Sequence, residues 1–275
     1  MKTVIEKIIW LLLCAWCVSC QQRVPNTIEN AQATNHQPSE KGKVLFVTSN
    51  AHFYGDTNLE TTNHFPEIIF AHNELVAAGL TVDFVSPDGG AIPLGYIYSS
   101  DTITKKYLYD HTFMEQLRTT KSPGAIDASV YDAIYFTGGG SAMFTVPYNK
   151  VIQQLAMDIY EHGGLVTAIC HGTAGITHLK TRDGNFLVSD KKITGFPDQF
   201  EDTTATYYQS FPFSIEKAVT ANRGTFVYSE KGWDNFFVQD GRIITGQDPT
   251  SAEPVAQAIL QTLHTKTIKT TKNEK

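Results

Sequence analysis

The chain has 275 residues, of which 41% are hydrophobic and 18% charged, with a formal net charge of −6 at pH 7. This length accommodates one sizeable folded domain, and an acidic balance without a basic run argues against a nucleic-acid partner. Three of the 4 cysteines (Cys14, Cys17 and Cys20) fall near the N-terminus, which leaves Cys170 alone in the remaining sequence. A single thiol excludes an internal disulfide framework there. An unpaired cysteine in an exported domain is therefore a candidate for a chemical role.

Residues 1–20 are expected to form a bacterial lipoprotein signal peptide. Lys2 and Lys7 place positive charge ahead of an apolar run at residues 8–18, which is too short to span a membrane comfortably. Cys-Val-Ser-Cys at the end of this segment resembles a lipobox, and Cys20 would be the lipidated residue. Such boxes usually carry leucine at the position of Cys17. Ordinary signal cleavage and an uncleaved anchor therefore remain alternatives.

The rest of the chain divides into a tether, a domain and a tail. Residues 21–41 are polar and cannot bury a core, so they are expected to be a disordered tether. Residues 42–264 are predicted to form one α/β domain, and residues 265–275 a polar tail. Together with the signal, this organisation predicts a lipid-anchored protein of the bacterial cell envelope, in the periplasm or at the cell surface. Only the lipid anchor would contact the membrane.

Predicted strands and helices alternate along the domain. Apolar runs predict strands at 43–49, 81–85, 131–136 and 165–169, and near 192–195, 225–228, 236–239 and 242–245. Helices are predicted from about Pro66, near 110–117, over 148–162, and from a Ser251 cap to about His264. This alternation is typical of a doubly wound, mostly parallel sheet flanked by helices. Ligands of such sheets bind at the carboxyl ends of the strands, where Gly138–Gly140 and Cys170 both fall.

The predicted strand at 165–169 ends abruptly in Cys170-His171-Gly172. A strand that turns sharply into a helix projects the turn residue above the sheet edge, and it aims the following backbone N–H groups at whatever that residue attacks. Cys170 is therefore predicted to be a nucleophile whose pKa the helix N-terminus lowers. The simpler alternative is an inert, buried cysteine. An adjacent histidine and glycine are poor core residues, and they favour the nucleophile.

The sequence Ala-Ile-Cys-His-Gly at 168–172 resembles the nucleophile elbow of the ThiJ/PfpI superfamily, specifically its heat-shock chaperone and glyoxalase III branch. Three further stretches match this branch in order, at 82–90, 131–139 and 241–252, and the similarity covers about 43–263. The resemblance implies a flavodoxin-like fold of the class I glutamine amidotransferase type.

The resemblance also assigns roles around the elbow. Cys170 matches the family nucleophile, and His171 matches its neighbouring histidine. Glu67 falls where the family places the acid that hydrogen-bonds the thiol, although a carboxylate there could simply favour the helix N-terminus. Gly138 and Gly139 match a glycine turn whose N–H groups, with that of His171, would hold an oxyanion.

A third acid is expected to orient the histidine. In the segment Phe-Pro-Asp-Gln-Phe-Glu the family match falls on Glu201, and Asp198 and Asp202 are near enough to remain alternatives. Such a carboxylate would fix the tautomer of His171 and stabilise its charged form.

The resemblance implies a glutathione-independent, glyoxalase III-type enzyme, also called a D-lactate dehydratase. Cys170 would add to methylglyoxal or a related reactive carbonyl, and His171 or Glu67 would move a proton from C1 to C2. The 2-hydroxy acid would follow by hydrolysis. The chemistry implies no cofactor, and the remaining histidines show no spacing typical of a metal site.

Two other functions are weighed against this one. In a stress-protective holdase or cysteine-oxidation sensor, Glu67 would hold a sulfinate of Cys170. In an amidase or peptidase of the PfpI type, the elbow would work with a late histidine, but the corresponding segment 246–249 (Gly-Gln-Asp-Pro) contains none. For the glyoxalase, the expected partner is a small-molecule carbonyl substrate. A homodimer is a further possibility.

Overall fold

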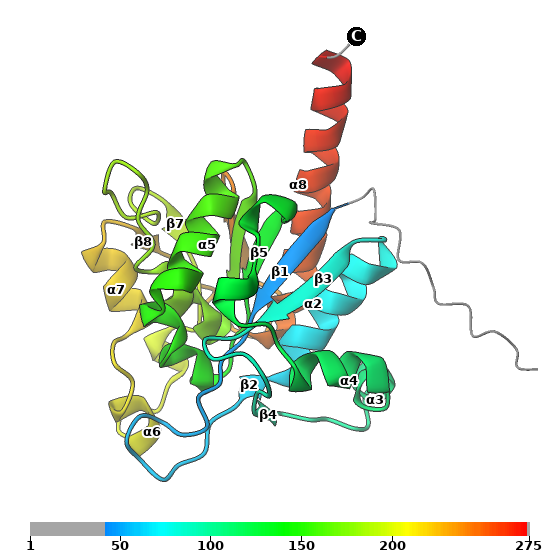
Figure 1. Ribbon diagram of the computed structural model, residues 1–275. Coiled ribbons are helices and arrows are strands. Elements are labelled where there is room, and N and C mark those ends of the chain that lie inside the picture. The colour runs from blue at the N-terminus through cyan, green and yellow to red at the C-terminus, as the bar shows by residue number, and fades with distance from the viewer. Residues whose placement is uncertain (1–41, 274–275) are drawn as a thin grey trace, which may run out of the picture. The chain divides into compact units, whose positions relative to one another are not determined.

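Six strands form the central sheet of the domain in the order β3-β1-β5-β6-β10-β9 (Figure 1). Five run parallel, and β9 pairs antiparallel with β10 at the edge. The strands are β1 Lys43–Val47, β3 Thr81–Val85, β5 Ala133–Phe136, β6 Leu165–Ile169, β9 Phe237–Asp240 and β10 Ile243–Gly246. The central strands β1, β5 and β6 are nearly continuous apolar runs, because helices cover both of their faces. The predicted doubly wound α/β sheet is confirmed.

This computed structural model describes the backbone of residues 42–273 and the side chains as far as residue 265. The predicted signal peptide, Cys20 and the predicted tether lie outside the described residues. Within residues 42–273, no helix is both long and apolar enough to cross a membrane.

Two layers of helices enclose the sheet. On one face, α2 (Phe65–Ala77) and α8 (Ala252–Asn273) pack over β1 and β6, with α3 (Thr102–Leu108) and α4 (His111–Arg118) beside them. On the other face lie α5 (Lys150–Glu161) and α7 (Ile215–Ala221). Each face therefore has its own buried apolar cluster, and the two clusters hold the sheet rigid beneath the loops at its edge.

Short elements make up many of the connections between the strands and the longer helices. Two-residue strands pair in parallel, β2 (Asn63–His64) with β4 (Leu94–Gly95) and β7 (Lys192–Ile193) with β8 (Thr225–Phe226). The short helix α6 spans Thr206–Gln209, and the 3-10 helices are η1 Pro123–Ala125, η2 Ala128–Val130, η3 Gly140–Met143, η4 Val146–Tyr148, η5 Cys170–Ile176, η6 Asp198–Phe200 and η7 Pro249–Ser251.

The last helix begins where predicted, at Ala252 directly after Ser251, but it ends later than predicted. Asp248 caps the preceding 3-10 turn η7, because its carboxylate accepts the N–H of Thr250, and this turn leads into α8. The helix then continues to Asn273, past the predicted end at His264 and through most of the predicted polar tail. No glycine or proline after residue 254 stops it.

Candidate active site

Cys170 is the first residue after β6 and stands in a backbone conformation that side chains rarely adopt. Its φ is +54° and its side chain is buried. For a non-glycine residue this conformation costs about 1–3 kcal/mol, and residues held in it cluster at functional sites. Gly172 makes the turn possible, because a Cβ there would lie 2.3 Å from the carbonyl oxygen of Phe136. The elbow continues as the 3-10 helix η5, where the sequence predicts a helix without specifying its kind.

His171 lies between the thiol and a carboxylate. Its Nδ1 is 3.4 Å from Cys170 Sγ, and its Nε2 is 2.7 Å from Glu201 Oε1. The second carboxylate oxygen of Glu201 accepts a 2.9 Å hydrogen bond from the hydroxyl of Tyr207. The imidazole also stacks on Phe196, with ring centroids 4.9 Å apart. The ring is therefore fixed on both edges and on one face, with one nitrogen directed at the thiol.

The three acids considered for this role occupy different places. Only Glu201 contacts His171. The carboxylate of Asp198 accepts the hydroxyl of Ser214, and that of Asp202 accepts the N–H and hydroxyl of Thr204. Asp202 therefore stabilises a local turn, and Asp198 joins its loop to the start of α7. The geometry selects Glu201 as the histidine-orienting acid.

Glu67 reaches the opposite side of Cys170 from the first turn of α2. Its side chain is fully buried, and its Oε2 accepts a 2.9 Å hydrogen bond from the N–H of Gly138. A Cβ on Gly138 would lie 2.4 Å from this oxygen and 2.9 Å from the Cβ of Cys170. Only glycine at 138 therefore lets the acid, the thiol and the β5 loop meet.

Burial dominates the protonation of this pair. It raises the pKa of Glu67 to about 8, against the opposing hydrogen bonds from Cys170 and Gly138. Burial likewise raises the pKa of the Cys170 thiol well above its ordinary range; a charged Glu67 would raise it further, and the N–H of His171 opposes the shift. The predicted lowering of the thiol pKa is therefore wrong. At neutral pH, Glu67 carries a proton and the thiol needs a base, for which His171 Nδ1, 3.4 Å from the sulfur, is the candidate.

The predicted oxyanion donors are only partly free. The N–H of Gly138 is used by Glu67. The N–H groups of Gly139 and His171 remain as candidate donors, and Gly139 needs its glycine for a φ of +97°. These two N–H groups are the candidates for stabilising a negative oxygen on a carbon bonded to Cys170.

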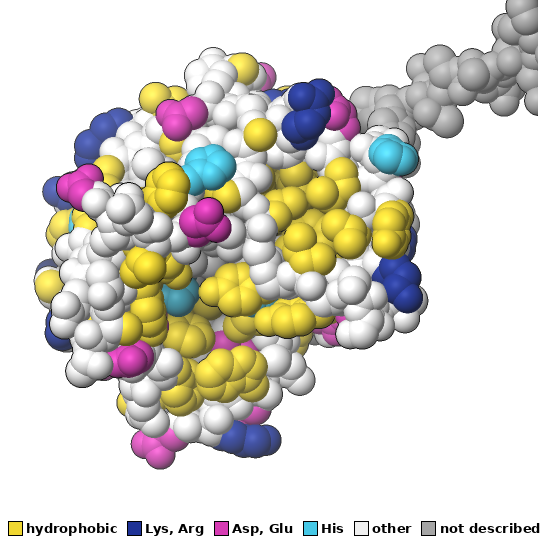
Figure 2. Space-filling view, turned by 90° about the horizontal axis from the view of Figure 1, so that it is seen from below, with side chains coloured by type: hydrophobic (Ala, Val, Ile, Leu, Met, Phe, Trp, Pro, Cys, Tyr) yellow, Lys and Arg dark blue, Asp and Glu magenta, His cyan; other side chains and the backbone are white. Residues whose placement is uncertain are grey.

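A cavity of about 440 Å³ opens above Cys170 and His171. Figure 2 looks onto this end of the domain and shows hydrophobic side chains around a hollow that contains histidine. Aromatic side chains form most of the wall, from residues far apart in the sequence: Tyr54, Tyr96, Tyr98, Phe196, Phe200, Tyr207, Phe211 and Trp233. No lysine or arginine lines this cavity. It therefore suits a small, uncharged, partly apolar molecule.

His64 also lines this cavity, and sequence reasoning did not single it out. A histidine three residues before a predicted site acid, at the start of the same helix, is the signal that could have identified it. The aromatic wall had no such signal, because its members come from separate loops.

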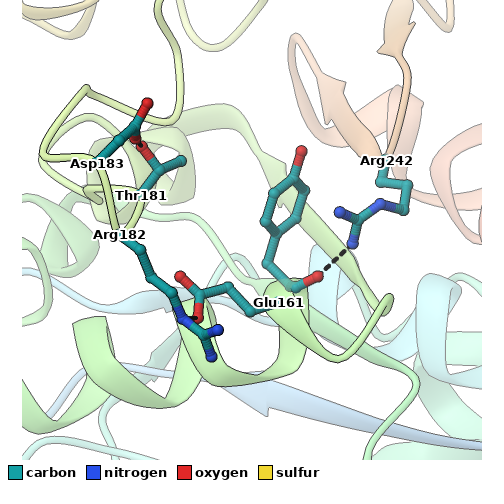
Figure 3. Close-up of a pocket in the computed structure, with 6 residues that line it drawn as sticks. Glu161, Thr181, Arg182, Asp183 and Arg242 are labelled. Carbon is teal, nitrogen blue, oxygen red and sulfur yellow. Dashed lines mark hydrogen bonds and ion pairs between the residues drawn. The ribbon is translucent and has the colours of Figure 1, made fainter.

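A second hollow, of about 410 Å³, lies elsewhere on the domain (Figure 3). Its charged groups already have partners: Arg182 pairs with Glu161, and the hydroxyl of Thr181 donates to Asp183. Arg242 donates to the carbonyl oxygens of Tyr160 and Gly164. These contacts stabilise the surrounding loops and leave this hollow without an unpaired charged group among the residues named.

Comparison with known proteins identifies a family and its members. The model of the DJ-1/PfpI family matches residues 64–262. The chain is 30% identical over 233 residues to "Glutathione-independent glyoxalase HSP31" of Saccharomyces cerevisiae, covering 78% of this chain and 95% of that protein. It is 33% identical over 162 residues to "Glyoxalase 3" of Candida albicans, covering 56% of this chain and 69% of that protein.

Solved structures show the same similarity. The crystal structure of glyoxalase III from Candida albicans superposes with a TM-score of 0.73 at 25% identity, over 80% of this chain and 97% of the other. The Rapid Encystment Protein 24 kDa of Francisella tularensis superposes with a TM-score of 0.76 at 30% identity, over 81% of this chain and 99% of the other.

Proposed function

We propose, because the chain belongs to the DJ-1/PfpI family, that it is a glutathione-independent glyoxalase of the glyoxalase III type. It would convert methylglyoxal or a related 2-oxoaldehyde to a 2-hydroxy acid. One observation supports this most strongly: Cys170 lies between His171, which Glu201 orients, and the protonated acid Glu67. A base on one side of a nucleophile and an acid on the other is what a proton-transfer reaction on a thiol adduct requires.

The first step forms a hemithioacetal. His171 takes the thiol proton as Cys170 Sγ attacks the aldehyde carbon C1, and the Glu201 carboxylate stabilises the imidazolium that results. The C1 oxygen becomes a hydroxyl with the proton of Glu67. At the end of this step the substrate is bonded to sulfur, His171 is charged and Glu67 is a carboxylate.

The second step moves hydrogen from C1 to C2. The Glu67 carboxylate takes the C1 proton while His171 gives its proton to the C2 oxygen, which leaves an enediol. Glu67 then returns its proton to carbon C2 as His171 takes the proton of the C1 hydroxyl. The product of this step is a thioester of the 2-hydroxy acid, so C1 has been oxidised and C2 reduced within one molecule.

Water completes the cycle. The Glu67 carboxylate takes a proton from the water that attacks the thioester, and His171 returns its proton to the departing sulfur. Glu67, His171 and the thiol regain their starting states. The N–H groups of Gly139 and His171 are placed to stabilise the oxyanion of this attack.

A direct assay tests the proposal. Purified protein is given methylglyoxal without glutathione, and D-lactate is measured for the wild type and for Cys170→Ser. The expected result is lactate formation that depends on Cys170. Equal rates for the two proteins, or no lactate from a folded wild type, would contradict it.

We also propose that the protein is a lipoprotein of the bacterial cell envelope, attached through Cys20. The proposal rests on the charged and apolar N-terminal pattern and on the lipobox-like sequence at 17–20. An enzyme anchored in this way would act on reactive carbonyls outside the cytoplasm, as part of a stress response. A homodimer stays a prediction, which sedimentation of the purified domain measures.

A further inference from the structure

His64 and Glu67 face each other through polar atoms that have no hydrogen-bond partner among the residues described. The Nδ1 atom of His64 is 3.6 Å from Glu67 Oε1. Both atoms are buried, and neither has a hydrogen-bond partner within the described part of the chain. The other carboxyl oxygen, Oε2, is the one that meets Gly138 and the Cys170 side. The carboxyl group of Glu67 thus points one oxygen at the elbow and the other at His64.

The protonation states of the two groups are complementary. Burial, and then the charge of the nearby His171, lowers the pKa of His64 to about 3. Burial raises that of Glu67 to about 8. Near neutral pH the imidazole is therefore uncharged while the carboxyl group holds a proton. A shift of a few tenths of an ångström would let the Glu67 O–H donate to Nδ1, and the remaining proton of the imidazole would then sit on Nε2.

Packing alone does not explain an imidazole at this position. The ring of His64 stacks on Tyr96, with centroids 4.3 Å apart, which any flat aromatic ring could do. The residue is the N-cap of α2, yet its side chain makes no capping hydrogen bond. Its backbone N–H donates to the Gly138 carbonyl oxygen at 3.0 Å and holds the residue beside the glycine turn. The two ring nitrogens are left without a structural role.

The structure of the proposed substrate suggests a role for Nε2 of His64. A 2-oxoaldehyde bonded to Cys170 has oxygens on two adjacent carbons. The N–H groups of Gly139 and His171 are the candidate donors to the C1 oxygen. Negative charge also develops on the C2 oxygen as the C1 proton leaves, while the proton of His171 is still being transferred to it. His64 lines the same cavity as Cys170, and a neutral imidazole can donate to such an oxygen without losing its proton.

We propose that His64 is a further catalytic residue, whose Nε2–H holds the C2 oxygen of the Cys170-bound substrate while its Nδ1 faces Glu67. This inference rests on the proposed glyoxalase function. No bond to His64 forms or breaks in the reaction: its N–H stabilises the developing charge on the C2 oxygen. The tautomer is set in the resting site, where the protonated Glu67 faces Nδ1. Its loss should slow proton transfer and leave the attack of the thiol unchanged.

Two variants and a matched control test the role of the nitrogens. His64→Phe keeps a ring for Tyr96 and removes both nitrogens, and His64→Asn keeps a donor. His178→Phe is the control, because that ring packs on Phe213, with centroids 5.1 Å apart, in an aromatic cluster outside the cavity. For each protein, thermal unfolding, kcat and KM on methylglyoxal, and the rate of Cys170 alkylation by iodoacetamide are measured.

We expect His64→Phe to lose about 10²-fold in kcat, the usual effect of removing one donor to a developing oxyanion, with alkylation within about twofold of the wild type. His64→Asn should recover part of this loss, and His178→Phe should match the wild type. A kcat of His64→Phe within twofold of the wild type, or alkylation slowed as much as turnover, would overturn the proposal.

The remaining outcomes are equally decisive. If His64→Phe does not fold, His64→Asn decides alone: its kcat must fall at least about tenfold at unchanged alkylation, and a smaller fall refutes the role. A folded wild type that forms no lactate overturns the proposed function and the role of His64 together. An active wild type with an unaffected His64→Phe overturns the role of His64 alone.

Discussion

The N–H of Gly138 donates a 2.9 Å hydrogen bond to Oε2 of Glu67, and this bond joins the loop after β5 to the first turn of α2. It holds a fully buried acid against the elbow. Because the carboxyl group is protonated near neutral pH, no buried negative charge has to be stabilised in the resting site. Catalytic geometry and stability thus depend on the same contact.

Gly138→Ala should therefore inactivate the protein. The added Cβ would lie 2.4 Å from Glu67 Oε2, so either the acid or the elbow must move. We expect kcat to fall by more than about 10²-fold, since misplacing a catalytic group by about 1 Å costs that much. The measurement is lactate formation beside thermal unfolding. Gly124→Ala is the matched control, because a Cβ at that position meets nothing within 4 Å; equal activity of the two variants would refute the prediction.

Variants of the two acids should lose activity for different reasons. Glu67→Gln removes the group that donates and accepts protons, whereas Glu201→Gln chiefly misorients His171. Each should lower kcat by about 10²–10⁴-fold, and the double variant should be little worse than the worse single one, because the groups act as a unit.

The same variants separate an enzyme from an oxidation sensor. If Glu67 served only to hold oxidised Cys170, Glu67→Gln would keep its turnover and change only the sulfinate yield after peroxide. Steady-state rates and intact-mass spectra on both variants distinguish these cases. Normal turnover in Glu67→Gln would show that Glu67 is not a catalytic residue.

Alkylation of Cys170 should respond to pH in the alkaline range. Burial raises the pKa of the thiol, so the thiolate forms at higher pH in the folded protein than in the unfolded chain. The rate of iodoacetamide labelling, followed on the peptide that contains Cys170, should therefore have its midpoint above that of the same protein in denaturant. A native midpoint below the denatured one would show that the elbow lowers the pKa after all.

Cys20→Ala should release the protein from the membrane and leave the domain folded. Residues 21–41 contain few apolar side chains and should add nothing to the core. Fractionation of cells that produce each form, with glyoxalase activity as the sign of folding, checks this. Equal membrane association of both forms would identify the apolar run at 8–18 as the anchor.

Local patterns in the sequence predicted the fold well. The strand over Thr81–Val85 has the expected bounds, because an apolar run between a helix end and a Ser-Pro-Asp-Gly turn can form little else. The adjacency of Cys170 and His171 likewise lies within one motif. Residue spacing and resemblance placed Glu67 and Glu201, and the structure brings Glu67 to the thiol and Glu201 to the far nitrogen of His171.

Other features depend on contacts that no local pattern records. The use of the Gly138 N–H by Glu67 joins residues far apart in the chain. The direction of the thiol pKa depends on how deeply the elbow is buried, which the motif alone cannot give. His64 was missed because its importance lies in a distance to Glu67 and in two unpartnered atoms.

The aromatic wall above Cys170 also bears on how a turnover ends. The substrate is uncharged, but the 2-hydroxy acid leaves as an anion. The cavity offers this anion no lysine or arginine, and Glu201 lies in its wall. The product therefore meets repulsion where the substrate met a neutral apolar surface, so each cycle should finish with rapid departure of the acid and little inhibition by accumulated product.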